Sequence, residues 1–270
     1  MQIQDLSDAN VWDLASFCLR DCQKEAWYCR GDEQRIQTAW KRKEKYLQKM
    51  LRAGVRAKIA YSRQTPLGFI EYYPIETTNL ELVGENIMAI WCINVAQSVR
   101  GQGIGSQLLK ACLGDVKKLG RKGVAVTCWD PLWMPKGFFK KHGFREVGKA
   151  VGAGLVFFHA EKAVAPPKWI GRGATYEIIP LVEDKAVLDI FHSDRCPIHW
   201  RNTALIKEIA SEFHKHLLIR EYDMDEREAV LKHRIQYSVF LDGKVIAAGP
   251  QVKAESIRQK ITAAINAHQQ

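Results

Sequence analysis

The sequence lacks several features that would assign it to a class of protein directly. It has no apolar run long enough to cross a membrane, and its first residues, MQIQDLSDANVWD, are too polar for a signal peptide. We therefore expect a cytoplasmic protein that does not bind membranes. Its seven cysteines are an odd number and are scattered, which argues against the disulfide framework of a small secreted domain. The cysteines that stand close together have no histidine nearby, so we expect no metal site.

The chain also lacks an aromatic RNA-binding signature, although its net charge is +10. Its basic residues are interleaved with acidic ones, as in WKRKEKYLQKMLR, and are spread along the sequence. A positive charge of this kind attracts an anionic cofactor or substrate as well as it attracts a nucleic acid. We therefore do not expect a nucleic-acid partner. The sequence gives no indication of the oligomeric state.

One stretch of 27 residues, INVAQSVRGQGIGSQLLKACLGDVKKL at 93–119, predicts the end of a strand, a tight loop and a long helix. Apolar residues recur at helical spacing from Ile104 to Leu119, and Gly120 is a natural stop. The loop in front of the helix leaves backbone N–H groups uncovered because glycines carry no side chain. The helix dipole adds partial positive charge at the same place. We expect this loop to bind a pyrophosphate through Gly101, Gln102, Gly103, Ile104 and Gly105, with side-chain contacts from Arg100 and Ser106.

Neither of two common phosphate-binding loops fits this stretch. A dinucleotide fingerprint would require a third glycine at Ser106, and a Walker loop would require Lys-Ser or Lys-Thr after the last glycine. The surrounding elements are predicted as helices at 9–20 and 33–52, strands at 55–62 and 67–73, and a loop at 77–86. An apolar strand at 87–95 precedes the loop, and a strand at 123–128, a helix at 135–142 and strands at 144–148 and 155–161 follow the long helix.

This order, the spacing Arg-x-x-Gly-x-Gly after an apolar strand and the later motif FFKKHGF together resemble the GNAT superfamily of N-acetyltransferases. The resemblance implies a mixed-sheet α/β domain, acetyl-CoA as cofactor, and direct acetyl transfer to a small-molecule or peptide amine. It also implies that the pantetheine arm lies along Ile93, Asn94 and Val95, where a backbone N–H would stabilise the oxyanion.

The composition changes at AVAPPKWIGRGA, residues 163–174, where paired prolines and two glycines predict a linker. Beyond it the sequence predicts a strand at 186–191, a helix at 202–214, a strand at 217–222, a helix at 226–232, a hairpin through Asp242-Gly243 and a helix at 256–265. This order resembles a thioredoxin-like domain, with Cys196 and His199 where that family carries Cys-x-x-Cys. The combination looks like the YoaP-like acetyltransferases. We therefore expect a GNAT domain at 1–163, a linker at 164–174 and a thioredoxin-like domain at 175–270.

The residues that would move protons are less evident than the cofactor loop. Phe139 stands where many GNAT proteins carry an acidic tyrosine, and it has no proton to give. The apolar strand carries no glutamate, so Glu71 on the adjacent strand is our candidate base. It would share a face with Phe69 and Tyr73, and aromatic surroundings would raise its pKa. The alternative is a salt-bridged structural glutamate. Cys128, His142, a nearby tyrosine and solvent are candidate proton donors, and Tyr72, Tyr73 and Trp91 could line the acceptor site.

Cys196 stands at a predicted helix start, where the helix dipole lowers the pKa of a thiol. It could be a lone reactive thiol stabilised by His199 and His192, although His199 in the resolving position allows no local disulfide. The alternative is a domain kept for docking. Two other functions therefore remain open beside acetyl transfer: a non-catalytic acyl-CoA sensor, and a thiol-handling protein that uses the second domain.

Overall fold

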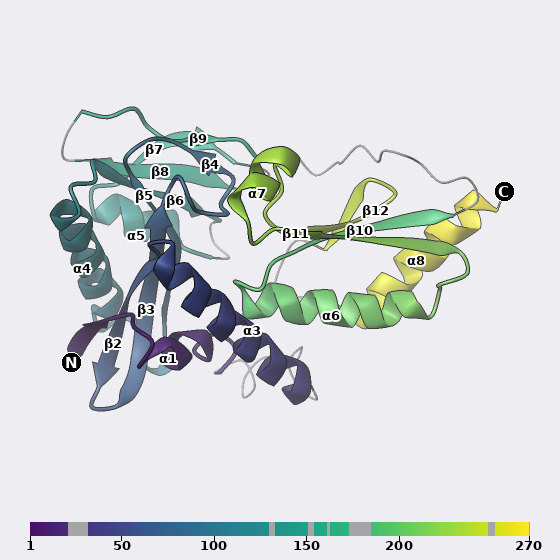
Figure 1. Ribbon diagram of the computed structural model, residues 1–270, viewed down its shortest axis with the longest axis horizontal. Helices are drawn as coiled ribbons and strands as arrows, with labels where there is room; N and C mark the ends of the chain where they lie inside the picture. The colour runs from purple at the N-terminus through teal and green to yellow at the C-terminus, as the bar shows by residue number, and fades with distance from the viewer. Residues whose placement is uncertain are drawn as a thin grey trace.

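The computed structural model describes residues 1–20, 32–129, 133–150, 154–160, 163–172, 185–247 and 252–269. Its N-terminal part is built on a seven-stranded mixed sheet with the strand order β1-β2-β3-β5-β6-β8-β7 (Figure 1). Neighbouring strands are antiparallel except for the parallel pair β5–β6. The strands are β1 Gln2–Asp5, β2 Arg56–Ser62, β3 Thr65–Pro74, β5 Met88–Val95, β6 Gly123–Cys128, β7 Arg145–Lys149 and β8 Leu155–Ala160.

Helices cover both faces of this sheet, which explains why its central strands are almost continuously apolar. Helices α1 (Val11–Ala15) and α3 (Glu33–Arg52) pack on one face, where Leu14 and Leu47 share a core with Phe69. Helices α4 (Ile104–Lys118) and α5 (Lys136–Lys141) pack on the other face, where Leu108 and Phe139 share a second core with strand residues. The predicted helix at 33–52 and the predicted strand at 123–128 are confirmed to the residue.

Three predictions for this part need correction. The helix predicted at 9–20 is regular only over α1, because the Ser16 hydroxyl donates to the carbonyl of Trp12 at 2.8 Å and Leu19 has a φ of 72°. Strand β1 was not predicted. The short strands β4 (Leu82–Val83) and β9 (Lys168–Trp169) pair with each other, although they fall in the predicted loop and the predicted linker. Residues 173–174 of that linker lie outside the described residues.

The C-terminal part has the element order that the sequence predicts. Its sheet has the order β11-β10-β12-β13, with β10 and β11 parallel and the other pairs antiparallel. Helices α6 and α8 pack together on one face, and α7 lies on the other (Figure 1). The elements are β10 Ala186–His192, α6 Pro197–Ser211, β11 Leu217–Asp223, α7 Arg227–His233, β12 Ser238–Leu241, β13 Lys244–Ala247 and α8 Ala254–His268.

Helix α6 begins five residues before the predicted start, at Pro197. Proline is favoured in the first turn of a helix because its missing N–H would have no partner there. The early start makes Cys196 the N-cap residue and directs the segment before it, Arg195, towards the first sheet. The beginning of α6 therefore joins the two parts of the molecule.

A buried cluster of charges lies at this junction. Lys43 of α3 and Glu71 of β3 form an ion pair with 3.1 Å between Nζ and Oε2, and their side chains are 1% and 0% exposed. The guanidinium of Arg195, also fully buried, lies 3.6 Å from Glu71 Oε1 and stacks over the rings of Tyr73 and Trp91 at 3.7 and 4.4 Å. The Tyr73 hydroxyl donates to Glu71. One carboxylate thus interacts with a cation from each part of the chain.

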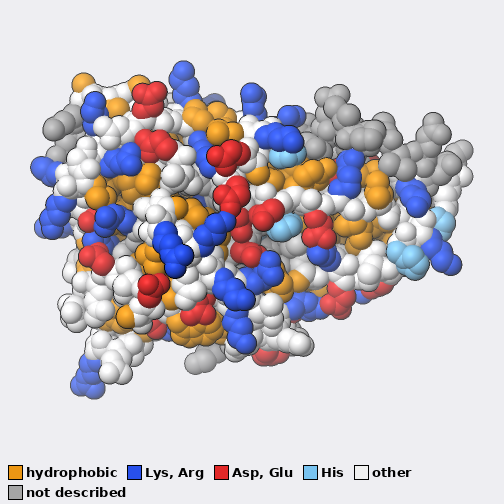
Figure 2. Space-filling model, viewed as in Figure 1, with side chains coloured by type: hydrophobic (Ala, Val, Ile, Leu, Met, Phe, Trp, Pro, Cys, Tyr) orange, Lys and Arg blue, Asp and Glu red, His pale blue; other side chains and the backbone are white. Residues whose placement is uncertain are grey.

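Polar contacts surround this cluster on both sides. Arg227 of α7 donates to the carbonyls of Thr78, Leu80 and Leu82 at 2.9, 2.7 and 2.6 Å, so it holds the loop before β4. Along the outer edge, ion pairs join α3 to the second part, including Arg42 with Asp194 at 2.6 Å and Lys49 with Glu226. Figure 2 shows basic and acidic side chains gathered together in the middle of this face.

We predict that Glu71→Gln lowers the free energy of unfolding by about 3 kcal/mol at pH 7, because it leaves two buried cations without an anionic partner. Lys43 and Arg195 hold the pKa of Glu71 below its ordinary value of 4.5 although burial alone would raise it. The stabilisation is therefore complete above pH 4.5 and is lost as the pH falls through the folded-state value. Urea unfolding of the two proteins as a function of pH measures both effects. The control is Glu85→Gln, at an exposed position; an equal change in both variants would contradict the prediction.

Candidate active site

The central sheet opens into a fork between β5 and β6. Within the described residues, these strands pair only from Met88 with Val124 to Ile90 with Val126, whereas β5 continues to Val95 along β3. The predicted cofactor residues Ile93, Asn94 and Val95 lie on the part of β5 beyond this pairing and are half-buried. The edge of a strand that leaves its neighbour presents backbone N–H and C=O groups to a ligand that binds as an added strand.

The predicted phosphate loop lies directly beyond the end of β5. A short 3₁₀ turn at Gln97–Val99 leads into Gly101 and Gly103, which have φ values of 81° and 80°. Side-chain-bearing residues resist these conformations, which is the reason for glycine at both positions. A Cβ atom added to either would have no described atom within 4 Å, so open space lies in front of the loop. This space and the N-terminus of α4 can take up an anion, as the sequence predicts.

The other predicted residues of the loop have distinct roles in the fold. Arg100 donates from Nε to the Val95 carbonyl at 3.1 Å and so ties the loop to the end of β5. The Ile104 side chain is buried in the core under α4, which leaves only its backbone for a ligand. Phe138 packs against Gly105, with ring atoms 3.5 Å from a Cβ built there. Gln102 is exposed and Ser106 is half-buried.

The candidate base Glu71 does not have the environment that the sequence predicts. It does share a face with Phe69 and Tyr73, but it is fully buried and its pKa is lowered rather than raised. Burial raises the pKa, and the charges of Lys43 and Arg195 together with the Tyr73 hydroxyl outweigh that effect. The alternative of a salt-bridged glutamate therefore fits the structure better. Tyr73 is 0% exposed and does not line a surface that a substrate can reach.

The candidate proton donors differ in how accessible they are. Cys128 is 0% exposed, at the end of β6 in the core under α4. Phe139, at the position of the family tyrosine, is fully buried in the same core. His142 is half-buried, and its Nδ1 lies 2.8 Å from the carbonyl of Phe138. Of these candidates, His142 is the side chain with access to solvent.

The surroundings of Cys196 do not favour the reactive thiol that the sequence leaves open. Cys196 is 9% exposed, and burial raises the pKa of its thiol although the backbone N–H groups of His199 and Ile198 lower it. Burial also lowers the pKa of His199 to about 3, so this ring is neutral and stabilises no thiolate. The ring stacks on Tyr237 with 3.8 Å between centroids. Cys18 and Cys92 lie in the same cluster, and burial raises the pKa of both thiols.

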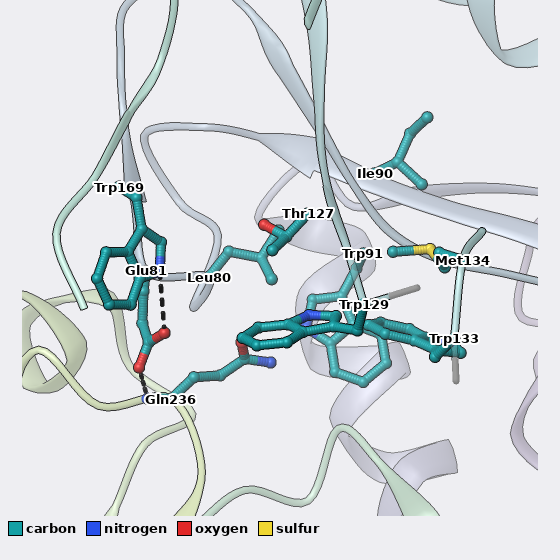
Figure 3. Close-up of a pocket in the computed structure, with 10 residues that line it drawn as sticks. All are labelled: Leu80, Glu81, Ile90, Trp91, Thr127, Trp129, Trp133, Met134, Trp169 and Gln236. Atoms are coloured by element: carbon teal, nitrogen blue, oxygen red, sulfur yellow. Dashed lines mark hydrogen bonds between the residues drawn. The ribbon is translucent and has the colours of Figure 1, made fainter. Parts of the chain in front are cut away.

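A small cavity with four tryptophans in its wall lies at the fork. Trp91 is on β5 and Trp129 directly follows β6. Trp133 lies shortly before α5 in the sequence, and Trp169 is on β9 (Figure 3). Backbone bonds of 3.0 and 2.9 Å between Trp129 and Trp133 hold these two side by side, and the rings of Trp91 and Trp133 meet edge to face at 6.0 Å. The cavity has a volume of about 20 Å³.

Two glycines allow these rings to pack where they do. A Cβ at Gly154 would lie 2.7 Å from the ring of Trp129, and one at Gly171 would lie 2.2 Å from the ring of Trp169. Both distances are far below van der Waals contact, so a side chain at either position would displace a wall of the cavity.

The one carboxylate among the residues that line the cavity belongs to Glu81, beside β4. Its Oε1 accepts from the backbone N–H of Gln236 at 3.0 Å, and its Oε2 accepts from Trp169 Nε1 at 3.3 Å (Figure 3). Burial raises the pKa of Glu81 to about 7, against the effect of these two bonds. Gln236 comes from the second part of the chain, so both parts build this site.

Sequence reasoning missed Glu81 and three of the four tryptophans. Half of the chain's eight tryptophans line this one cavity, but they come from segments that are far apart in the sequence. Among the three that were missed, the local signal was the pair Trp129 and Trp133 just after an apolar strand. Residues 130–132 between them lie outside the described part of the chain.

The described residues thus form a forked mixed sheet with a glycine-rich loop at its open end. The model of the acetyltransferase (GNAT) family matches residues 19–144. No curated protein matches the chain. In the described residues no helix is long and apolar enough to cross a membrane.

Solved structures similar to the chain share low sequence identity with it. The PaiA N-acetyltransferase from Thermoplasma acidophilum in complex with coenzyme A is 16% identical, with a TM-score of 0.43 over 59% of this chain and 99% of that one. A GNAT-family acetyltransferase from Brucella melitensis in complex with acetyl-CoA is 13% identical, with a TM-score of 0.41 over 61% and 90%. Aminoglycoside 6'-acetyltransferase type Ii is 19% identical, with a TM-score of 0.45 over 59% and 97%.

We predict that Cys196 is protected from thiol reagents in the native protein, because its thiol is buried and its pKa is raised. Iodoacetamide labelling at pH 8, followed by peptide mass spectrometry, should leave the Cys196 peptide unmodified until denaturant is added. The chain should also be inactive in an insulin disulfide-reduction assay. Rapid native labelling of Cys196, or disulfide reduction that Cys196→Ser abolishes, would contradict this.

Proposed function

We propose that the protein is an acetyl-CoA-dependent N-acetyltransferase that transfers the acetyl group directly to an amine. The observation that carries this proposal is the fork between β5 and β6 with the open glycine loop at its end. The acceptor amine belongs to a small molecule or a peptide. It enters from the side of the tryptophan-lined cavity, which is lined by residues of both strands at the point where their pairing stops.

The residues present fit acetyl-CoA. The backbone N–H groups from Gly101 to Gly105 would hold the pyrophosphate, because a Cβ at Gly101 or Gly103 would enter the space that it needs. The edge of β5 at 93–95 would hold the pantetheine arm. When bound, acetyl-CoA supplies an acetyl thioester, so that acylation of an amine forms a carbon–nitrogen bond, breaks a carbon–sulfur bond and releases a proton.

Direct transfer is favoured over a covalent acyl-enzyme on Cys92 or Cys196, because both thiols are poor nucleophiles. Cys92 and Cys196 are buried, and burial raises the pKa of both. A thiol must be deprotonated to attack a thioester, and these two remain protonated at neutral pH.

A non-catalytic acyl-CoA sensor is the second candidate, and the buried Phe139 favours it. This side chain replaces the tyrosine that would protonate the leaving thiolate in the GNAT family. Solvent or His142 would have to supply that proton in an active enzyme. Release of free thiol from acetyl-CoA in the presence of an amine distinguishes the enzyme from the sensor.

For the second part we propose a thioredoxin-like fold without thiol chemistry. The parallel pair β10–β11 followed by an antiparallel hairpin supports this fold. Its role would be to complete the acceptor side, since it supplies Arg195 to the buried charge cluster and Gln236 to the cavity. On this proposal residues 1–163 and 175–270 fold as two domains that function together.

We predict that Gly103→Val weakens binding of acetyl-CoA by about tenfold or more, because a β-branched residue resists a φ of 80° and its side chain fills the space before the loop. Calorimetric titration with acetyl-CoA measures the change. Gly114→Ala is the matched control: it lies within α4, and a Cβ there also has no described atom within 4 Å.

The two candidate functions give different results in the same set of proteins. The enzyme releases free thiol from acetyl-CoA with an amine panel, and Gly103→Val loses this activity while Gly114→Ala keeps it. The sensor binds acetyl-CoA without release of thiol. Unchanged acetyl-CoA affinity in Gly103→Val would remove the basis of both.

A further inference from the structure

We propose that the tryptophan-lined cavity binds the ammonium group of a primary amine and that Glu81 is the carboxylate that accepts its proton. This inference rests on the proposed acetyltransferase function, because it names the class of acceptor for the same site. It assigns to Glu81 the task that the sequence pattern suggested for Glu71.

The position of the cavity connects the two faces of the fork. Ile90 and Met134 in its wall belong to the core on the side of α4 and the glycine loop. Trp91 belongs to the core on the opposite side. The cavity therefore lies beside the last paired residues of the two strands, Ile90 and Val126. An amine bound there would lie close to the part of β5 that we propose holds the pantetheine arm.

The size of the cavity selects the kind of amine. A volume of about 20 Å³ holds one water-sized group, since a cavity needs roughly 10–15 Å³ to hold a water. The –NH₃⁺ group of a primary amine is of this size. A trimethylammonium group is several times larger and would require the indoles to move, and each N-methyl group adds a carbon that the cavity has no room for.

The indole rings and the Glu81 carboxylate in the cavity wall favour a bound cation. Indole rings attract cations through their π-electrons, and Trp91 already carries the Arg195 guanidinium on one face at 4.4 Å. Each carboxylate oxygen of Glu81 accepts one hydrogen bond and keeps capacity for another. Arg227, which holds the same loop, directs its donors to the carbonyls of Leu80 and Leu82, and no charged side chain contributes to the pKa of Glu81.

The proton transfer follows from these groups. An amine arrives as R–NH₃⁺, whose nitrogen has no lone pair for attack on a carbonyl carbon. Transfer of one proton to the Glu81 carboxylate leaves a neutral amine beside a neutral carboxylic acid, so mass and charge balance within the pair. Burial raises the pKa of Glu81 to about 7, which suits a base that acts at neutral pH.

The test measures amine binding to the full chain in the absence of acetyl-CoA. Calorimetric titrations at pH 7 use methylamine, n-butylamine and phenethylamine as primary amines, and trimethylphenethylammonium as the enlarged cation. We expect at least one primary amine to bind about tenfold or more tightly than the enlarged cation. Failure of all three primary amines to bind, or equal binding of the enlarged cation, overturns the inference.

Proton release identifies Glu81 in the same experiment. A bound cation favours the ionised carboxylate, so at pH 7 a group with a pKa of about 7 should release up to about half a proton per amine bound. At pH 9 the carboxylate is already ionised and releases none. Titration in two buffers of different ionisation enthalpy measures this release. Glu81→Gln should remove it and weaken binding about tenfold, whereas Glu85→Gln, at an exposed position in the same segment, should change neither.

A gain-of-function variant keeps the test decisive if Glu81→Gln does not fold. Trp133→Leu removes part of the wall and should let N-methylphenethylamine bind as tightly as phenethylamine, whereas Trp12→Leu, at a 39% exposed indole, should not. If Trp133→Leu still binds phenethylamine more tightly than N-methylphenethylamine by the same factor, the inference is overturned.

A separate titration with acetyl-CoA distinguishes this inference from the proposed function. If the protein binds amines but not acetyl-CoA, the acetyltransferase is refuted. If it binds acetyl-CoA but no amine, only the acceptor site is refuted.

Discussion

The structure depends on one buried carboxylate that faces two cations. Glu71 is fully enclosed, and both its partners, Lys43 and Arg195, are nearly or fully buried with it. A charge in such a place is tolerated only when it is paired, since the cost of removing it from water is large. Because Lys43 comes from the first part of the chain and Arg195 from the second, the pairing fixes how the two parts lie against each other.

That arrangement also brings residues of the second part to the tryptophan-lined cavity. The segment that carries Arg195 leads into α6, and the segment after α7 brings the backbone N–H of Gln236 to Glu81. The second part thereby closes one side of the tryptophan-lined cavity. Its cysteine motif, which in a thioredoxin-like protein would do redox chemistry, is enclosed in the same junction and is chemically quiet. Burial of this motif is consistent with our proposal that the second part has no thiol chemistry.

The pKa values of the two glutamates near the fork are shifted in opposite directions, because the two carboxylates have different neighbours. Burial raises the pKa of both, but Glu71 lies between two cations and Glu81 accepts only two neutral hydrogen bonds. The first is therefore a permanent charge that organises the fold. The second titrates near neutral pH, which is the property required of a base.

The sequence by itself determined the elements whose cause is local. Glycines at 101 and 103, followed by apolar residues at helical spacing, are sufficient for a loop with positive φ and the helix α4. The apolar run of β5 and the element order of the second part could be predicted in the same way, whereas the role of Ile93 to Val95 was implied by a family resemblance. Only the tertiary structure decided the chemistry of the side chains around the fork, because a pKa depends on groups that folding brings from distant segments. Lys43 and Arg195 reverse the pKa shift that burial alone would give Glu71, and Trp169 and Gln236 donate hydrogen bonds to Glu81. No local pattern encodes these contacts.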